Sequence, residues 1–218
     1  MRIKFDEQLK NLNNEMISMS AMIEKAIQEA IDALLTQNIK KAKQIMKDDE
    51  LVDREQKKIE SICFQLLIQQ QPVARDLRII TAAMKMVTDM ERIGDQAADI
   101  AELTVMLAKD PYMPKVEHIK KMSFETITML IKAVEAYVEQ DMEKAKEVIE
   151  HDDVVDELFL QVKNELIALM KKSTGCEEQA ADMLMVNKYL ERIGDHASNI
   201  AEWVIFSVDD HVRDEFPS

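Results

Sequence analysis

The stretch Glu91-Arg-Ile-Gly-Asp-Gln-Ala-Ala-Asp-Ile-Ala-Glu102 returns a hundred positions later as Glu191-Arg-Ile-Gly-Asp-His-Ala-Ser-Asn-Ile-Ala-Glu202, with nine of twelve positions identical. A repeat this strict indicates that the 218-residue chain contains two copies of one structural unit. The repeated residues include carboxylates and a glycine, which helix packing alone would not select. The duplication therefore points to both the fold and the place of function.

The composition around this repeat is that of long helices. The chain has only three glycines and four prolines, against ordinary shares of roughly 7% and 5%. Apolar residues make up 47% of the chain, which is enough for each half to bury a core of its own. We therefore expect an all-α protein with almost no sheet, folded as two compact halves.

Apolar residues recur at alternating spacings of four and three, for example from Ile79 through Ala83, Met86 and Met90. This spacing is typical of helices that pack side by side. Pro72 and the stretch 110–114 interrupt it. The expected helices span about residues 3–36, 39–70, 73–109, 116–139, 141–171 and 177–208. Short turns make neighbouring helices antiparallel, which predicts two tandem three-helix bundles built from six long antiparallel helices.

The repeat also extends beyond its strictest stretch. Residues 41–53 correspond to residues 144–156 at an offset of 103, so at least two helices of each unit are duplicated. We predict three regions, which are a first bundle over 1–110, a second bundle over 115–210 and a flexible tail over 211–218.

The net charge is −14, and no basic stripe offsets it. A phosphate backbone would be repelled, so nucleic acid is not an expected partner, whereas cations and basic protein surfaces are. The N-terminus has no apolar signal-peptide region, and no apolar run approaches the roughly 18 residues of a membrane span. We expect a soluble cytoplasmic protein without direct membrane insertion.

Carboxylates gather at the edge of the expected helical faces. At 100° per residue, Glu91 and Asp95 fall within about 40° of each other, and the Asp-x-x-x-Asp pairs of the preceding helices lie at the margin of their apolar faces. If adjacent helices bring these edges together, each half gathers four carboxylates over one groove. The first-half residues are Asp49, Asp53, Glu91 and Asp95, and the second-half residues are Asp152, Asp156, Glu191 and Asp195.

Such an oxygen-rich set suits magnesium, calcium, manganese or iron, with zinc as a further candidate, and its paired motifs could bridge more than one ion. The alternative is a solvated acidic face that Arg92, Arg192 and nearby lysines neutralise, because charge pairs at helical spacing are common. The duplication shifts the balance toward metal.

Glycine and histidine stand beside these acidic pairs. Gly94 and Gly194 fall in the middle of helices, where glycine costs roughly 0.5 to 1 kcal/mol relative to alanine. We favour a close helix crossing as the reason, with access of a ligand to the backbone as the alternative. His151 and His196 adjoin the acidic pairs in sequence, not one turn away, so we expect surface histidines.

Three features resemble the PhoU family of bacterial and archaeal phosphate-signalling proteins. They are the stretch 69–78, the doubled Glu-Arg-Ile-Gly-Asp and the doubled Asp-x-x-x-Asp of the preceding helix, and together they cover almost the whole chain. The resemblance implies a three-helix bundle per repeat and metal clusters on the acidic motifs. It thereby makes ligand candidates of the same eight carboxylates. One departure is that the basic element at the start of the third helix, Ala74 to Arg78, occurs only in the first half.

The resemblance also implies a function. It suggests a non-enzymatic regulator that couples the ATPase subunit of a phosphate transporter to a sensor histidine kinase and represses the phosphate-starvation response. We expect a homodimer, which heptad seams allow. The alternatives are a plain helical scaffold without metal and a carboxylate-bridged di-metal oxidase. The second is weakened because its Glu-x-x-His motif is missing. The residues three before the four histidines are Lys115, Val148, Ile193 and Val208.

Overall fold

A computed structural model describes residues 2–70, 72–109, 116–172 and 175–209, and these residues form six helices and no strand. The helices are α1 Arg2–Thr36, α2 Ile39–Gln70, α3 Ala74–Leu107, α4 Glu117–Glu139, α5 Met142–Lys172 and α6 Glu177–Val208. The all-α prediction is confirmed, and each helix ends within two residues of its expected limit. Across the described ranges, no helix is apolar over a long enough stretch to cross a membrane.

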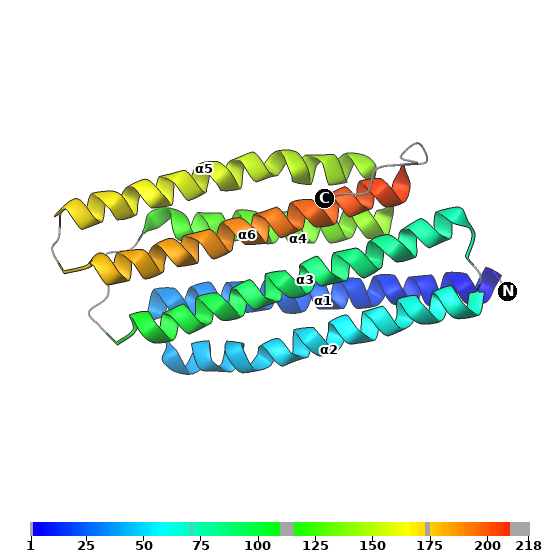
Figure 1. Ribbon diagram of the computed structural model, residues 1–218, viewed down its shortest axis with the longest axis horizontal. Helices are drawn as coiled ribbons and strands as arrows, with labels where there is room; N and C mark the ends of the chain where they lie inside the picture. The colour runs from blue at the N-terminus through cyan, green and yellow to red at the C-terminus, as the bar shows by residue number, and fades with distance from the viewer. Residues whose placement is uncertain (1, 71, 110–115, 173–174, 210–218) are drawn as a thin grey trace.

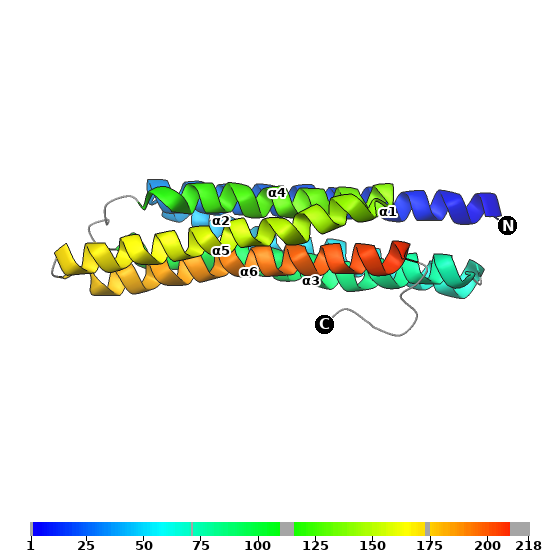
Figure 2. The same cartoon turned by 90° about the horizontal axis from the view of Figure 1, so that it is seen from above.

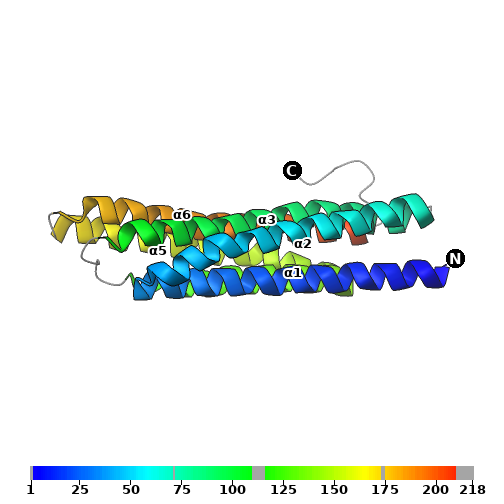
Figure 3. The same ribbon diagram turned by 90° about the horizontal axis from the view of Figure 1, so that it is seen from below.

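The helices form two trios, α1–α3 and α4–α6, and the trios lie side by side along their length (Figure 1). Helix α1 packs on α4 and α3 packs on α6, so that α1 and α4 form one layer and α3 and α6 the other (Figure 2). Helices α2 and α5 lie on the two outer sides, as the view from below also shows for α2 (Figure 3). The predicted boundary at 110–114 and the predicted tail over 211–218 lie outside the described residues.

The first turn of each trio is built in the same way. Gln37 and Gln140 both adopt the left-handed conformation, with φ of 53° and 55°, which ends the first helix and reverses the chain. The next residue then caps the second helix. Asn38 Oδ1 accepts a hydrogen bond from the Lys41 amide at 3.0 Å, and Asp141 Oδ1 accepts one from the Lys144 amide, also at 3.0 Å.

A single apolar core runs through both trios. On α3, adjacent residues are buried in pairs, such as Ile79 with Ile80 and Met86 with Val87. Both members of a pair are buried because α3 packs against α1 and α2 on one side and α6 on the other. Tyr137 of α4 is also wholly buried, and its hydroxyl donates to the carbonyl of Ile79 at 3.3 Å. The two predicted halves therefore share one core.

The close helix crossing expected at the two mid-helix glycines is present. A Cβ atom at Gly94 would lie 3.0 Å from Val52 Cγ1 of α2, and one at Gly194 would lie 3.2 Å from Val155 Cγ1 of α5. Each crossing also lays an aspartate over the glycine, since the same Cβ positions are 3.6 Å from Asp49 Oδ1 in the first trio and 3.1 Å from an Asp152 oxygen in the second. The missing Cβ thus sets how closely the acidic residues of neighbouring helices approach.

Gly94→Ala tests this packing constraint. Alanine favours the helix by up to about 1 kcal/mol, but its Cβ would press on the stiff Val52 side chain, and overpacking costs about 1 to 3 kcal/mol. We expect a net loss of about 1 kcal/mol in the free energy of unfolding, measured by denaturant titration. In a Val52→Ala background, the same change should become neutral or stabilising. A more stable Gly94→Ala variant in the otherwise unchanged chain would contradict the crossing argument.

Candidate metal site

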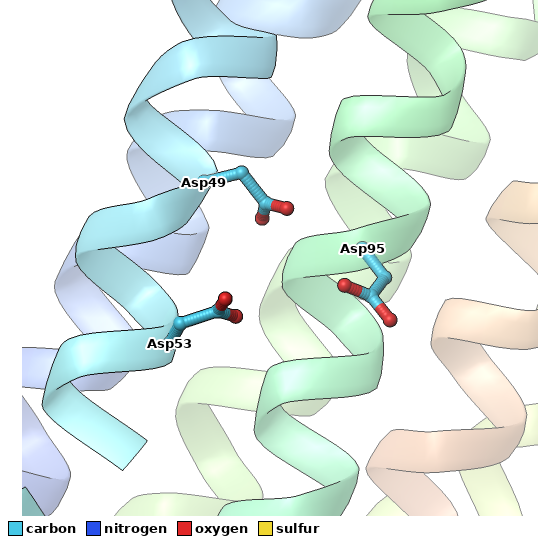
Figure 4. Close-up of side chains that lie close together, drawn as sticks. All are labelled: Asp49, Asp53 and Asp95. Atoms are coloured by element: carbon cyan, nitrogen blue, oxygen red, sulfur yellow. The ribbon is translucent and has the colours of Figure 1, made fainter. Parts of the chain in front are cut away.

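The predicted carboxylates of the first trio come together where α2 crosses α3. Asp49 and Asp53 lie one turn apart on α2, and Asp95 faces them from α3 (Figure 4). One carboxylate oxygen from each of the three lies within 4.8 Å of the others, and all three side chains are half-buried. We call these three residues the acidic cluster. Its hard oxygen donors suit Mg²⁺, Ca²⁺, Mn²⁺ or iron.

Glu91 lies at the edge of this cluster. It stands one turn before Asp95 on α3 and is half-buried. Arg92 lies beside both acidic residues, with its Nε atom 3.6 Å from Glu91 and its Nη1 atom 3.6 Å from Asp95. Its side chain is more than half exposed, so solvent weakens its effect on the two carboxylates. Arg92 therefore neutralises only part of the charge of these carboxylates.

Burial and mutual repulsion change the protonation of the cluster. Burial, followed by the charges of Asp95 and Asp53, raises the pKa of Asp49 from 3.8 to about 6. Burial is also the main cause that raises the pKa of Glu91 and of Asp95, although Arg92 acts in the opposite direction on both. The cluster thus holds negative charges at short range that a bound cation would neutralise.

The second trio repeats the acidic motif, but its carboxylates are arranged differently. Burial, then Asp195 and Asp156, raises the pKa of Asp152 to about 6, which matches Asp49. However, Asp156 and Asp195 are exposed, and Glu191 forms an ion pair with Lys188. Within the described ranges, the acidic cluster on α2 and α3 is the one place where oxygens of three carboxylates lie within 4.8 Å of one another.

Lys188 is the residue that the sequence analysis missed. It occupies the place of Thr88 in the first repeat, where the hydroxyl only donates to the carbonyl of Met84. In the second trio the Lys188 ammonium binds Glu191, lies 5.7 Å from the centre of the Phe159 ring, and works against the other causes that raise the pKa of Asp195. A comparison of the two repeats at this position would have predicted the difference.

Asp99 is a second residue that the predicted site left out. It lies one turn beyond Asp95 on α3 and is half-buried. Burial, then Asp95 and Glu102, raises the pKa of Asp99, whereas Arg192 of the second trio acts to lower it. The row of carboxylates therefore continues along α3, within reach of the charge of Arg192 on α6. Asn199 takes this place in the second repeat.

Both histidines, which were expected at the surface, are partly buried and contact a neighbouring helix. His196 Nδ1 lies 2.9 Å from Asp89 Oδ1, with only 18% and 17% of the two side chains exposed, and thereby joins α6 to α3. His151 Nε2 lies 2.8 Å from Glu125 Oε2 and joins α5 to α4. Both rings therefore meet a carboxylate of a neighbouring helix, although 31% of the His151 side chain stays exposed.

Comparison with known proteins agrees with this architecture. The sequence model of the PhoU domain matches the chain twice, over residues 16–104 and 119–204. The "phosphate-specific transport system accessory protein PhoU homolog" of Clostridium acetobutylicum is 38% identical over 94% of each chain, and that of Methanothermobacter thermautotrophicus is 34% identical over 95% of each. The crystal structure of PhoU from Pseudomonas aeruginosa superposes with a TM-score of 0.87 at 29% identity, covering 94% of this chain and 98% of that one.

Asp49→Asn separates the electrostatic cost of the cluster from its ligand role. The folded-state pKa of Asp49, about 6, lies above the ordinary 3.8, so the wild-type chain takes up a proton on folding between these values and loses stability as pH rises through the window. In chelator-treated protein at pH 7, the neutral amide should raise the free energy of unfolding by about 1 kcal/mol, allowing for solvent screening of a half-buried group.

Thermal unfolding from pH 5 to 7.5 measures this effect, which should shrink toward the acidic end. Asp152→Asn is the matched control in the second trio and should behave in the same way. Equal destabilisation by Asp49→Asn at every pH, without metal, would show that the carboxylate is held by favourable contacts instead of opposed by its neighbours.

Proposed function

The chain belongs to the PhoU family, and we propose that it is a cytoplasmic, non-enzymatic regulator of phosphate uptake and signalling. The observation that carries the proposal is the double match of the PhoU domain, which covers both trios. Relatives that align over almost the whole chain are named as accessory proteins of a phosphate-specific transport system. A further structural relative, from Streptococcus pneumoniae, is titled a phosphate transport system regulatory protein and has a TM-score of 0.87 at 25% identity.

The proposed mechanism is protein binding. In it, the chain contacts the ATPase subunit of a phosphate transporter and a sensor histidine kinase, and it holds the starvation response off when phosphate is plentiful. The long outer helices offer the extended faces that helix-in-groove recognition uses. The net charge of −14 favours partners that present a basic surface.

We further propose that the acidic motifs hold metal. In the first trio Asp49, Asp53 and Asp95 would supply the ligands and Glu91 would complete the set, because these carboxylates oppose one another until a cation neutralises them. The ion could be iron, zinc, manganese, magnesium or calcium, and the paired motifs leave room for more than one. The second set, Asp152, Asp156, Glu191 and Asp195, should bind more weakly because Lys188 already neutralises part of its charge.

Metal content tests the site. We expect elemental analysis of protein never exposed to chelator to find metal in the wild-type chain. The pair Asp53→Asn with Asp95→Asn should lose most of it, and the pair Asp156→Asn with Asp195→Asn should lose less. Adding metal back should raise the Tm of the wild type and of the second pair only. A metal-free wild type, or equal losses from the two pairs, would refute the proposed site or its asymmetry.

Deletion of the gene tests the regulatory role. Starvation genes should then be expressed constitutively at high phosphate, and the wild-type chain should restore repression. In pull-downs, the purified chain should capture the transporter ATPase subunit and the kinase, with an unrelated acidic helical protein as the control. Normal repression in the deletion strain would exclude this function, whatever the metal content.

A further inference from the structure

A pocket of about 110 Å³ opens between α1, α2 and α3, on the side of Gly94 where Asp49 lies. Its wall is apolar and comes from all three helices, with Met22 and Ala26 from α1, Ile45 and Val52 from α2, and Ala98 from α3. The space is equivalent to roughly three or four water molecules. We call it the α1–α3 pocket. Because Gly94 also lines it, the pocket depends on the same missing Cβ as the helix crossing.

Most of the charged groups that line the same pocket are negative. Glu29, Asp48 and Asp49 contribute three carboxylates, and Lys25 contributes the single ammonium. Among the residues described, none forms an ion pair with Glu29 or Asp49, whereas Asp48 accepts one hydrogen bond, from the side-chain amide of Gln44 at 2.7 Å. The pocket therefore combines an apolar wall with a local excess of negative charge that Lys25 offsets only in part.

The second trio provides an internal comparison at an offset of 103. There Glu125 replaces Met22, Met129 replaces Ala26 and His151 replaces Asp48. Glu125 and His151 bind each other at 2.8 Å, and Met129 is buried. The corresponding polar groups thus satisfy one another, and a long apolar side chain takes the place of a methyl group. Three residues that line the pocket of the first trio thus have counterparts of a different chemical kind in the second trio.

We propose that the α1–α3 pocket receives a lysine side chain from a protein partner. The tetramethylene stem would lie on the apolar wall, and the ammonium would lie among Glu29, Asp48 and Asp49, as amphipathic side chains do when stem and charge meet different surroundings. Three separate acceptors from two helices suit the three donors of an ammonium better than the planar fork of an arginine. The inference rests on the proposed function as a protein-binding regulator.

A bare metal ion fits this pocket less well. Glu29, Asp48 and Asp49 do not bring their oxygens within the 4.8 Å that the acidic cluster reaches, and an apolar wall supplies no ligands. Asp49 belongs to both places, so it lies between the proposed ion and the proposed lysine. The same carboxylate would then contact both the docked lysine and the bound metal.

Methyl NMR of the full chain tests the proposal with a defined probe. N-acetyl-lysine methylamide should shift the methyl signals of Met22, Ile45 and Val52 in a saturable manner, with a Kd on the order of millimolar, as expected for a single side chain. Val148 and Val155 hold the corresponding places in the second trio, and their signals should not move. N-acetyl-norleucine methylamide, which has a stem of similar length without the ammonium, should give no saturable shift.

Variants that copy the second repeat should abolish binding. Glu29→Lys and Asp48→His place the residues of positions 132 and 151 at the pocket, and each should weaken binding of the lysine probe at least tenfold. Glu157→Lys makes the same charge change on an exposed position of α5 and should bind as the wild type does. Unchanged methyl signals in the second trio would confirm that each variant is folded.

Several results would overturn the proposal. They are no saturable shift with the lysine probe, equal binding of the norleucine probe, tighter binding of N-acetyl-arginine methylamide, and undiminished binding by Glu29→Lys. The probe experiment does not depend on the cellular assay. Lysine binding in a chain whose deletion leaves repression normal would refute the regulatory role and leave the pocket standing, whereas normal regulation without probe binding would refute the pocket alone.

Discussion

The structure depends on how closely two helices approach at a position without a Cβ. At Gly94 the α2 helix comes so near to α3 that Val52 would touch an added methyl group, and Gly194 does the same for α5 and α6. Glycine in mid-helix lowers the stability of the fold, so the close contacts must stabilise the fold by more than this loss. They do so by packing Val52 and Val155 into the core, and they also hold the aspartates of one helix against the next.

Bringing carboxylates together destabilises the fold electrostatically, and the packing of the helices must offset this loss of stability. Burial and neighbouring charges raise the pKa of Asp49 and of Asp152 alike, so the unliganded fold carries groups that would be better separated. The two trios relieve this differently. Lys188 pairs with Glu191 of the second set from within the chain, whereas the exposed Arg92 lies at the edge of the first set. A cation supplied from solution therefore has more to neutralise in the first trio.

Much of the fold could be predicted because the heptad spacing and Pro72 fix where helices begin and end. The side-by-side packing of the trios could not be, since a seam shows that a face is buried but not which helix covers it. A signal was nevertheless present, because adjacent apolar pairs such as Ile79 and Ile80 imply a face wide enough for two neighbours. Asp49, Asp53 and Asp95 were predicted correctly as neighbours. The roles of Lys188 and His196 depend on which helix packs opposite them. The spacing of residues along one helix does not predict that neighbour.

The differences between the two repeats follow a consistent direction. At two places the second trio holds an ion pair that the first cannot form, His151 with Glu125 and Lys188 with Glu191, because Asp48 and Thr88 stand where His151 and Lys188 do. Such pairs fix the geometry of the second trio from within, while the first trio keeps half-buried carboxylates whose charge the exposed Arg92 balances in part. Helix α3 carries Asp95 on one side and packs against α6 on the other, where Asp89 meets His196. Any ligand that changes the α2–α3 crossing must therefore act on the helix that joins the two trios.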